Sequence, residues 1–221
     1  MDQILIVTGH YGCGKTSFAV SAALEKRRQG EAVTLIDLDI VNPYFRSADF
    51  KDELEREGVR VIAPAYAGSN LDLPVLSAAV DAAILDGGWV ILDVGGDDAG
   101  AVALGRYADK LRQRPHAFLY LLNGCRYLTD TPESCVCSLR EIEQASRLRV
   151  HGLINNTNLG PETTAELVRA SLPFAERTAE LAGLPLWGTA VMPSLQEPLS
   201  DLQGVIPLRR LVLPPWTERR E

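Results

Sequence analysis

Short apolar runs alternate with longer segments of helical periodicity along most of the chain. The runs are rich in Val, Ile and Leu, and in the segments between them apolar residues recur about every three to four positions. This alternation is typical of a parallel sheet that helices cover on both faces. It predicts strands near residues 3–8, 32–37, 59–62, 88–93, 116–122, 149–154 and 185–190, and helices near residues 15–29, 47–56, 73–86, 100–112, 132–147 and 162–182.

Glycines stand where several predicted helices should end. They precede the next predicted strand, as helix C-terminal caps do, at positions 30, 58, 87, 88 and 183. No internal repeat, low-complexity tract or charged linker divides the 221 residues. We therefore expect one doubly wound α/β domain over residues 1–221, with a mostly parallel sheet and an irregular tail from about residue 204.

The tail mixes apolar and basic residues in the segment VIPLRRLVLPPW, residues 205–216. Three prolines leave little uninterrupted length for a helix that lies on a membrane surface. We expect the tail to pack back onto the domain, and a membrane-surface helix is the alternative. No apolar run in the sequence is long enough to span a bilayer.

Charge and cysteine content limit the possible partners. The net charge of −7 argues against nucleic acid as a partner, because phosphate neutralisation requires clustered Lys and Arg. The N-terminus lacks the basic region and cleavage site of a signal peptide, so we expect a cytoplasmic protein with reduced thiols. Cys135 and Cys137 form a CxC pair. Such positions point about 200° apart on a helix, which favours packing over metal binding unless a dimer brings two pairs together.

Residues 9–16 read GHYGCGKT and match the phosphate-binding pattern GxxxxGK[ST], directly after a predicted strand and at the start of a predicted helix. The glycines allow the backbone N–H groups to point at phosphate oxygens, and the helix N-terminus adds a favourable dipole. Lys15 is expected to reach the β- and γ-phosphates, and the Thr16 hydroxyl to coordinate Mg²⁺. The predicted nucleotide contacts in this segment are Gly9, Gly12, Cys13, Gly14, Lys15, Thr16 and Ser17.

Two further predicted strands end in carboxylates. In the segment LIDLD, Asp37 and Asp39 could divide the work, one addressing Mg²⁺ through its waters and the other orienting a nucleophilic water. In WVILDVGG, Asp93 ends a buried strand, and the paired glycines after it would let the backbone approach a γ-phosphate. We assign Thr16, Asp37 and Asp93 to the metal, and Lys15 and Asp39 to catalysis.

Together these motifs resemble the MinD/ParA group of P-loop ATPases, which includes the nitrogenase iron protein and ATPases that insert metal centres. The resemblance covers residues 3 to about 195 and implies a P-loop NTPase fold of the nitrogenase-iron-protein/MinD type. It implies that Asp37 and Asp39 lie in switch I, with Asp39 positioning the attacking water, and that residues 93–96 form switch II.

The resemblance also extends to the base-binding end. In the segment GLINNTN it implies that Asn155 or Asn156 contacts adenine, and in VMPS that Pro193 belongs to a loop beside the base. The segment Asn155-Asn156-Thr157-Asn158 lacks the Asn-Lys-x-Asp pattern of common GTPases. That difference favours ATP without proving adenine over guanine.

One position departs from the pattern of that group. Its members carry a signature lysine just after the first glycine of the loop, which reaches across a dimer to the partner's nucleotide. This chain has His10 there, and Tyr11 where a glycine is usual. We therefore expect slow basal hydrolysis and weak ATP-driven self-association, with the missing cation supplied by Arg46, Arg126 or a partner protein.

The sequence predicts an ATPase that binds ATP or ADP with Mg²⁺ and acts as a nucleotide-dependent switch on an unidentified protein partner, with metal-centre assembly or positioning as a candidate setting. A homodimer is a further expected assembly. Two alternatives use the same fold: a small-metabolite kinase or amide ligase, and a non-hydrolysing nucleotide-dependent scaffold.

Overall fold

The structure, a computed structural model, describes residues 3–39, 50–63 and 73–209. Its centre is an eight-stranded sheet in the order β3-β2-β4-β1-β5-β6-β7-β8, and each neighbouring pair is parallel. The strands are β1 (Ile4–Gly9), β2 (Val33–Asp37), β3 (Val59–Ile62), β4 (Trp89–Asp93), β5 (His116–Leu122), β6 (Gly152–Asn155), β7 (Leu186–Val191) and β8 (Val205–Pro207).

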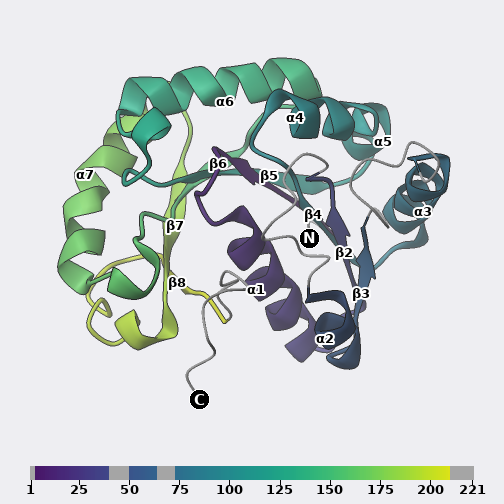
Figure 1. The fold of residues 1–221 in the computed structure, drawn as a ribbon, viewed down its shortest axis with the longest axis horizontal. Helices are drawn as coiled ribbons and strands as arrows, with labels where there is room; N and C mark the ends of the chain where they lie inside the picture. The colour runs from purple at the N-terminus through teal and green to yellow at the C-terminus, as the bar shows by residue number, and fades with distance from the viewer. Residues whose placement is uncertain (1–2, 40–49, 64–72, 210–221) are drawn as a thin grey trace.

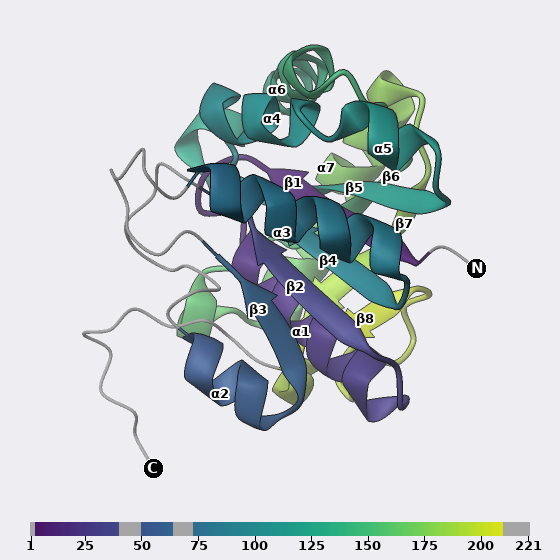
Figure 2. The same cartoon turned by 90° about the vertical axis from the view of Figure 1, so that its right-hand side faces the viewer.

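Helices cover both faces of this sheet. They are α1 (Lys15–Arg28), α2 (Lys51–Arg56), α3 (Leu73–Asp86), α4 (Asp98–Gly105), α5 (Ala108–Arg112), α6 (Pro132–Ser146) and α7 (Ala165–Ala182), with short 3₁₀ helices η2 (Tyr127–Thr129), η3 (Gly160–Glu162) and η4 (Pro193–Leu195). Figure 1 shows α4, α5 and α6 along one face and α1 and α2 along the other, and the turned view in Figure 2 keeps the same layers.

Two apolar cores correspond to these layers. One buries residues of α3 to α7, such as Ile84, Leu104 and Leu139, against one face of the sheet. The other buries residues of α1 and α2, such as Phe18 and Leu54, against the opposite face. Because both faces are covered, the central strands need continuous apolar runs, and this is the pattern that the sequence carries.

Two sequence predictions are wrong in detail. The helix expected over residues 100–112 is divided into α4 and α5, because Arg106 N and Tyr107 N bond to carbonyls three residues back, which tightens the turn. The expected irregular tail begins with a strand instead. In β8, Val205 to Pro207 pair with β7, and Leu208 after them is buried in the core beneath α1. The part of the tail from residue 210 lies outside the described residues.

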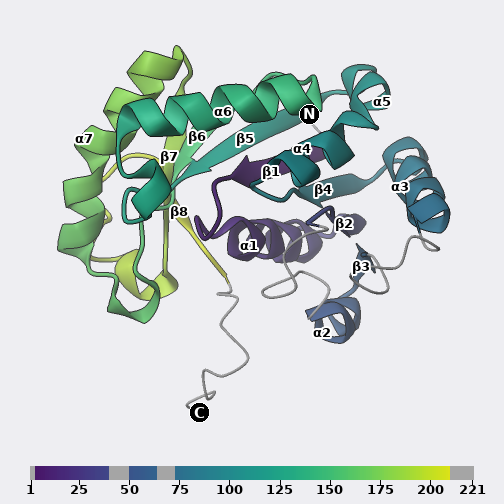
Figure 3. The same ribbon diagram turned by 45° about the horizontal axis from the view of Figure 1, so that its top comes forward.

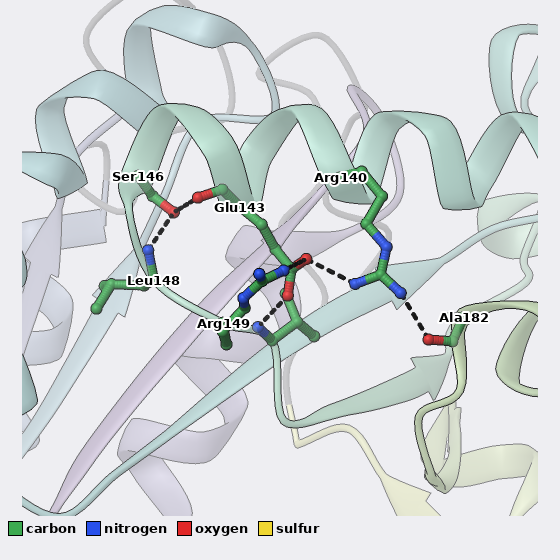
Figure 4. Close-up of polar contacts among 7 residues, drawn as sticks. Arg140, Glu143, Ser146, Leu148, Arg149 and Ala182 are labelled. Atoms are coloured by element: carbon green, nitrogen blue, oxygen red, sulfur yellow. Dashed lines mark hydrogen bonds and ion pairs between the residues drawn. The ribbon is translucent and has the colours of Figure 1, made fainter.

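Strand β6 begins at Gly152, three residues later than predicted, because a polar cluster shapes the chain before it (Figure 4). The Glu143 carboxylate is almost completely buried and accepts a bond of 2.9 Å from Val150 N. Arg140 and Arg149 pair with the same carboxylate at 2.6 and 3.0 Å, and Arg140 also donates to Ala182 O at 2.7 Å. The cluster therefore joins α6, the approach to β6 and the end of α7.

The glycines expected to end helices adopt left-handed backbone conformations, for example Gly183 after α7 with φ of 65°. Within the described parts of the chain, none of the helices combines the length and the hydropathy that crossing a bilayer requires.

Candidate nucleotide-binding site

The phosphate-binding loop joins the end of β1 to the start of α1 (Figure 3). Gly14 is the N-cap of α1 with φ of 87°, no side chain caps the helix, and its first turn contains no acidic residue. No side-chain cap and no carboxylate therefore compete with an anion at the start of α1, where the helix dipole is favourable. Only glycine fits at Gly9, because a Cβ would lie 2.5 Å from the backbone oxygen of Leu121.

Lys15 lies folded over this loop. Its side chain is almost entirely buried, and Nζ donates to His10 O at 3.3 Å. The backbone of Gly96, from the turn after β4, lies directly beside it. A Cβ built on Gly96 would be 3.0 Å from Lys15 Nζ and 2.2 Å from Gly9 O. The turn predicted as switch II thus contacts the loop with no room for a side chain.

The predicted carboxylates gather at the same edge of the sheet. Asp37 and Asp93 are register partners on β2 and β4 and are buried. Asp39 N donates to Asp37 Oδ1 at 2.9 Å. The Asp39 carboxylate turns toward Gly95, where an added Cβ would lie 3.3 Å from Asp39 Oδ1. The sheet order places β4 beside β1, so the carboxylates stand next to the loop.

These residues fit magnesium held mainly by phosphates and water. Among the described residues, no three His, Cys, Asp or Glu side chains converge closely enough to hold an ion by themselves. Mg²⁺ at nucleotide sites keeps several waters and needs few protein ligands. The Thr16 hydroxyl at the start of α1 and the buried carboxylates of Asp37 and Asp93 match that requirement.

Cys13 and His10 contribute differently to the loop. Burial raises the pKa of the Cys13 thiol, while the positive charge of Lys15 acts in the opposite direction. Because the thiol is fully buried, only the backbone of Cys13 could contact a bound nucleotide. His10 is half-buried, and its Nδ1 lies 3.3 Å from Tyr11 O.

The base-side residues divide into two groups. Asn156 Nδ2 donates to Cys13 O at 2.6 Å and so contacts the phosphate loop. Asn155, by contrast, turns to α7, where Nδ2 bonds Ser171 Oγ at 2.9 Å. Pro193 begins η4 and is exposed, whereas its neighbour Met192 faces the loop side.

A small cavity of about 50 Å³ lies between these segments. It is lined by Gly14, Ser17, Asn156, Thr157, Asn158, Gly160, Thr163, Val168, Ala190, Val191, Met192 and Leu208. The volume holds a few waters, so a purine base would require the lining side chains to move. Of the predicted base contacts, Asn156 lines the cavity and Asn155 and Pro193 do not.

Of the predicted sources of a second cation, the structure describes only Arg126. Arg126, in the loop after β5, donates from Nε to Gly12 O at 2.9 Å. Arg46 lies outside the described residues. The sequence did not predict that Met192 and Leu208 line the cavity. For Leu208 the available signal was the apolar pair Val205-Ile206 just before it, which forms β8.

The CxC pair behaves as its helical spacing predicts. In α6, Cys135 is buried and Cys137 is exposed, so the two thiols lie on different sides of the helix. Burial raises the pKa of Cys135 to about 12, which keeps it a neutral thiol.

No protein-family model matches the sequence, and the search of curated proteins gives no match. Solved structures do match. FtsY from Mycoplasma mycoides aligns with a TM-score of 0.57 at 17% identity, over 86% of this chain and 60% of that one. Signal recognition particle 54 kDa protein from Aeropyrum pernix K1, in complex with GDP, gives 0.58 at 17%, over 85% and 41%. The cell division protein ftsY of Thermotoga maritima gives 0.53 at 22%, over 86% and 62%.

The chain thus spans about two to three fifths of these matched chains. At such identities the likeness shows the fold alone. The chain has the α/β fold of P-loop nucleoside triphosphatases, with a parallel sheet and the phosphate loop after β1, and this confirms the fold class predicted from the sequence.

Proposed function

We propose that this chain binds Mg-ATP and hydrolyses it slowly, as a nucleotide-dependent switch on a protein partner, in the manner of the MinD/ParA group. The convergence of Lys15 and Gly96 carries the proposal. The start of α1 has no side-chain cap, and a buried lysine and a side-chain-free backbone turn meet beside it. A phosphate chain is the ligand that needs all three features.

Each residue then has a defined role in hydrolysis. Loop N–H groups and Lys15 bind the phosphates, and Asp39 orients a water toward the γ-phosphorus. The water oxygen forms a bond to that phosphorus while the bond to the β-phosphate oxygen breaks, giving ADP and phosphate. Bound Mg²⁺, held by Thr16 with Asp37 and Asp93, would supply charge neutralisation.

The cavity lining supports adenine as the base. Guanine presents adjacent N–H donors on its pairing edge, which a carboxylate accepts, whereas adenine presents a donor beside an acceptor. No Asp or Glu is among the described residues that line the cavity, and Asn156, Thr157 and Asn158 offer both donors and acceptors. Calorimetry with Mg-ADP and Mg-GDP tests this preference directly, and tighter binding of GDP would reverse it.

A protein partner is supported by apolar side chains around the loop. Tyr11 within the loop is 60% exposed, and Tyr127 and Leu128 in η2 are 88% and 63% exposed. Exposed apolar residues grouped beside a functional site mark an interaction surface more often than isolated ones do.

Lys15→Ala tests the proposal. Removing a charge-assisted phosphate contact should weaken Mg-ADP binding by about 1.5–3 kcal/mol, roughly 10-fold to 150-fold in Kd. Lys26→Ala is the matched control, because Lys26 lies on the same helix with Nζ 4.0 Å above the Trp89 ring. Equal calorimetric affinities of wild type and Lys15→Ala would refute the assignment.

Product analysis then separates the alternatives on this fold. Free phosphate indicates hydrolysis, a phosphorylated or amidated acceptor indicates a kinase or ligase, and tight binding without turnover indicates a scaffold.

A further inference from the structure

We propose that Arg126 is a second phosphate-facing cation of this nucleotide site, supplied by the same chain. The inference rests on the proposed function and adds a residue that the phosphate-loop pattern does not contain. Arg126 would keep its contact with the loop backbone and offer the other end of its guanidinium to the phosphates.

The first observation is the contact itself. Arg126 Nε donates to Gly12 O at 2.9 Å, across 114 residues of sequence. A Cβ built on Gly12 would lie only 3.3 Å from Nε, and Gly12 has φ of 75°. Glycine therefore suits this position, because its left-handed backbone favours glycine and a Cβ would crowd the Arg126 side chain.

Hydrogen bonds within the loop after β5 hold the backbone of Arg126 in position. Its N–H donates to Asn123 O at 3.2 Å, and its carbonyl accepts from Thr129 N at 2.9 Å. Cys125 N donates to Asn123 Oδ1 at 3.0 Å. The position of Arg126 thus depends on the end of β5, which lies next to β1 in the sheet.

The same loop is tied to the base side of the site. Gly124 N donates to Thr157 Oγ1 at 3.1 Å, and Asn123 Nδ2 donates to Asn158 O at 3.2 Å. Thr157 and Asn158 line the cavity described above. The guanidinium therefore belongs to a rigid frame shared by the phosphate and base ends of the site.

The second observation concerns the donors that remain. A guanidinium has five N–H donors in one plane, and the bond to Gly12 O uses the one on Nε. Among the described residues, no carboxylate pairs with Arg126, whereas Arg140, Arg149 and Arg169 each have one. Within the described part of the chain, the Nη groups of Arg126 thus have no carboxylate partner that competes with an anion at the loop.

The Nη donors of Arg126 could help neutralise the charge of bound phosphates. Within the described parts of the chain, Lys15 and Arg126 are the basic side chains that donate to the backbone between Gly9 and Gly14. A triphosphate brings more negative charge than one lysine neutralises. A planar fork suits phosphate oxygens, because two parallel N–H···O bonds can form at once.

The test compares Arg126→Ala and Arg126→Lys with wild type in the full chain. Calorimetry measures Kd for Mg-ADP and for a non-hydrolysable Mg-ATP analogue, and single-turnover phosphate release measures the rate. We expect Arg126→Ala to weaken the triphosphate analogue about 10-fold or more while ADP changes much less, and to slow hydrolysis by about 100-fold or more. Arg126→Lys keeps the positive charge but lacks the planar guanidinium. Its affinity for the triphosphate analogue and its hydrolysis rate should therefore lie between those of wild type and Arg126→Ala.

Guanidinium rescue distinguishes a phosphate contact from a structural brace. Millimolar guanidinium chloride should restore part of the rate of Arg126→Ala and none of the rate of Lys15→Ala. Arg60→Ala on β3, an exposed arginine away from the loop, controls for lost surface charge.

The outcomes separate this inference from the proposed function. Equal losses for ADP and the triphosphate analogue, with a lowered melting temperature and no rescue, would show a structural brace and overturn the inference. Unchanged binding and rate in Arg126→Ala would also overturn it, and the proposed function would stand if Lys15→Ala still lost affinity. Failure of the wild type to bind either nucleotide would overturn both.

Discussion

Gly96→Ala should slow turnover by roughly 100-fold while most of the fold survives. Gly96 has no positive φ, so alanine is compatible with its backbone, and the effect comes from space alone. A Cβ there would lie 2.2 Å from Gly9 O and 2.9 Å from the carbonyl carbon of His10. Both are backbone atoms of the phosphate loop, which cannot turn aside as a flexible side chain can.

The size of the effect follows from these distances. Real Cβ atoms essentially never come within 3.0 Å of such an atom, so the turn after β4 and the loop must separate by about 0.8 Å. Misplacement of a catalytic group by about 1 Å costs roughly 100-fold in rate. That factor corresponds to about 2.7 kcal/mol in the activation free energy. The strain should also lower the free energy of unfolding by about 1–3 kcal/mol.

The assay is single-turnover phosphate release at saturating Mg-ATP, with thermal unfolding measured in parallel. Gly105→Ala is the matched control, because its Cβ would also meet a backbone atom, Ala145 O at 2.9 Å, but between α4 and α6. Both variants should melt at lower temperature, and only Gly96→Ala should lose turnover per folded molecule. Equal rates for Gly96→Ala and wild type would refute the claim that this turn meets the γ-phosphate.

Three further predictions concern single residues. Asp39→Asn should leave the Kd for Mg-ATP within about 2-fold and slow single-turnover hydrolysis by about 10-fold or more, since water orientation matters in the transition state; an unchanged rate would mean that Asp39 has another role. His10→Lys should raise both turnover and ATP-dependent light scattering, because lysine places an ammonium group where the resembled family carries its signature lysine; a tight ATP-dependent dimer in wild type, unaffected by the change, would contradict this. At about pH 8 iodoacetamide should alkylate Cys137 before Cys13 or Cys135. Burial raises the pKa of both inner thiols, so their reactive thiolate fraction falls. Peptide mass spectrometry would show the reverse order if these thiols were accessible.

The sheet could be predicted from sequence because of how its strands are buried. Strands β1, β2, β4 and β5 are covered on both faces, so each is a mostly apolar run, and a glycine or a polar residue ends it or follows it. Strand β8 escaped prediction because it has three residues and ends in Pro207, which leaves too little pattern to recognise. The break between α4 and α5 escaped it because residues on both sides keep apolar spacing and no proline interrupts them.

The site was predictable where residues follow a strand end. Parallel strands bring their carboxyl ends to one edge, so Asp37, Asp93 and the loop meet without further information. The choice between Asn155 and Asn156 could not be made in this way. Successive residues at a strand end point to opposite sides, and only the placement of α7 decides that Asn155 faces Ser171.

The contacts of Arg126 depend on a similar fact of placement. Gly12 and Arg126 are far apart in the chain, and only the adjacency of β1 and β5 brings them together. The sequence could therefore name Arg126 only as one candidate cation beside Arg46 and a partner protein, without showing its contact with Gly12. The order of the strands is the information that the sequence pattern lacked.

The loop carbonyls show how binding of phosphate and base can be coupled. His10 O accepts from Lys15 Nζ, Gly12 O from Arg126 Nε, and Cys13 O from Asn156 Nδ2. The three donors come from different parts of the fold: Lys15 from α1, Arg126 from the loop after β5, and Asn156 from the loop after β6. The Lys15 ammonium has three N–H donors, so it can reach a phosphate while it still donates to His10 O. His10 O also accepts from Cys13 N at 3.2 Å. If the chain binds nucleotide as proposed, these three contacts would connect the phosphates with the loops after β5 and β6. The loop after β5 carries the exposed Tyr127 and Leu128, so a partner that binds them would sense the nucleotide through the same backbone.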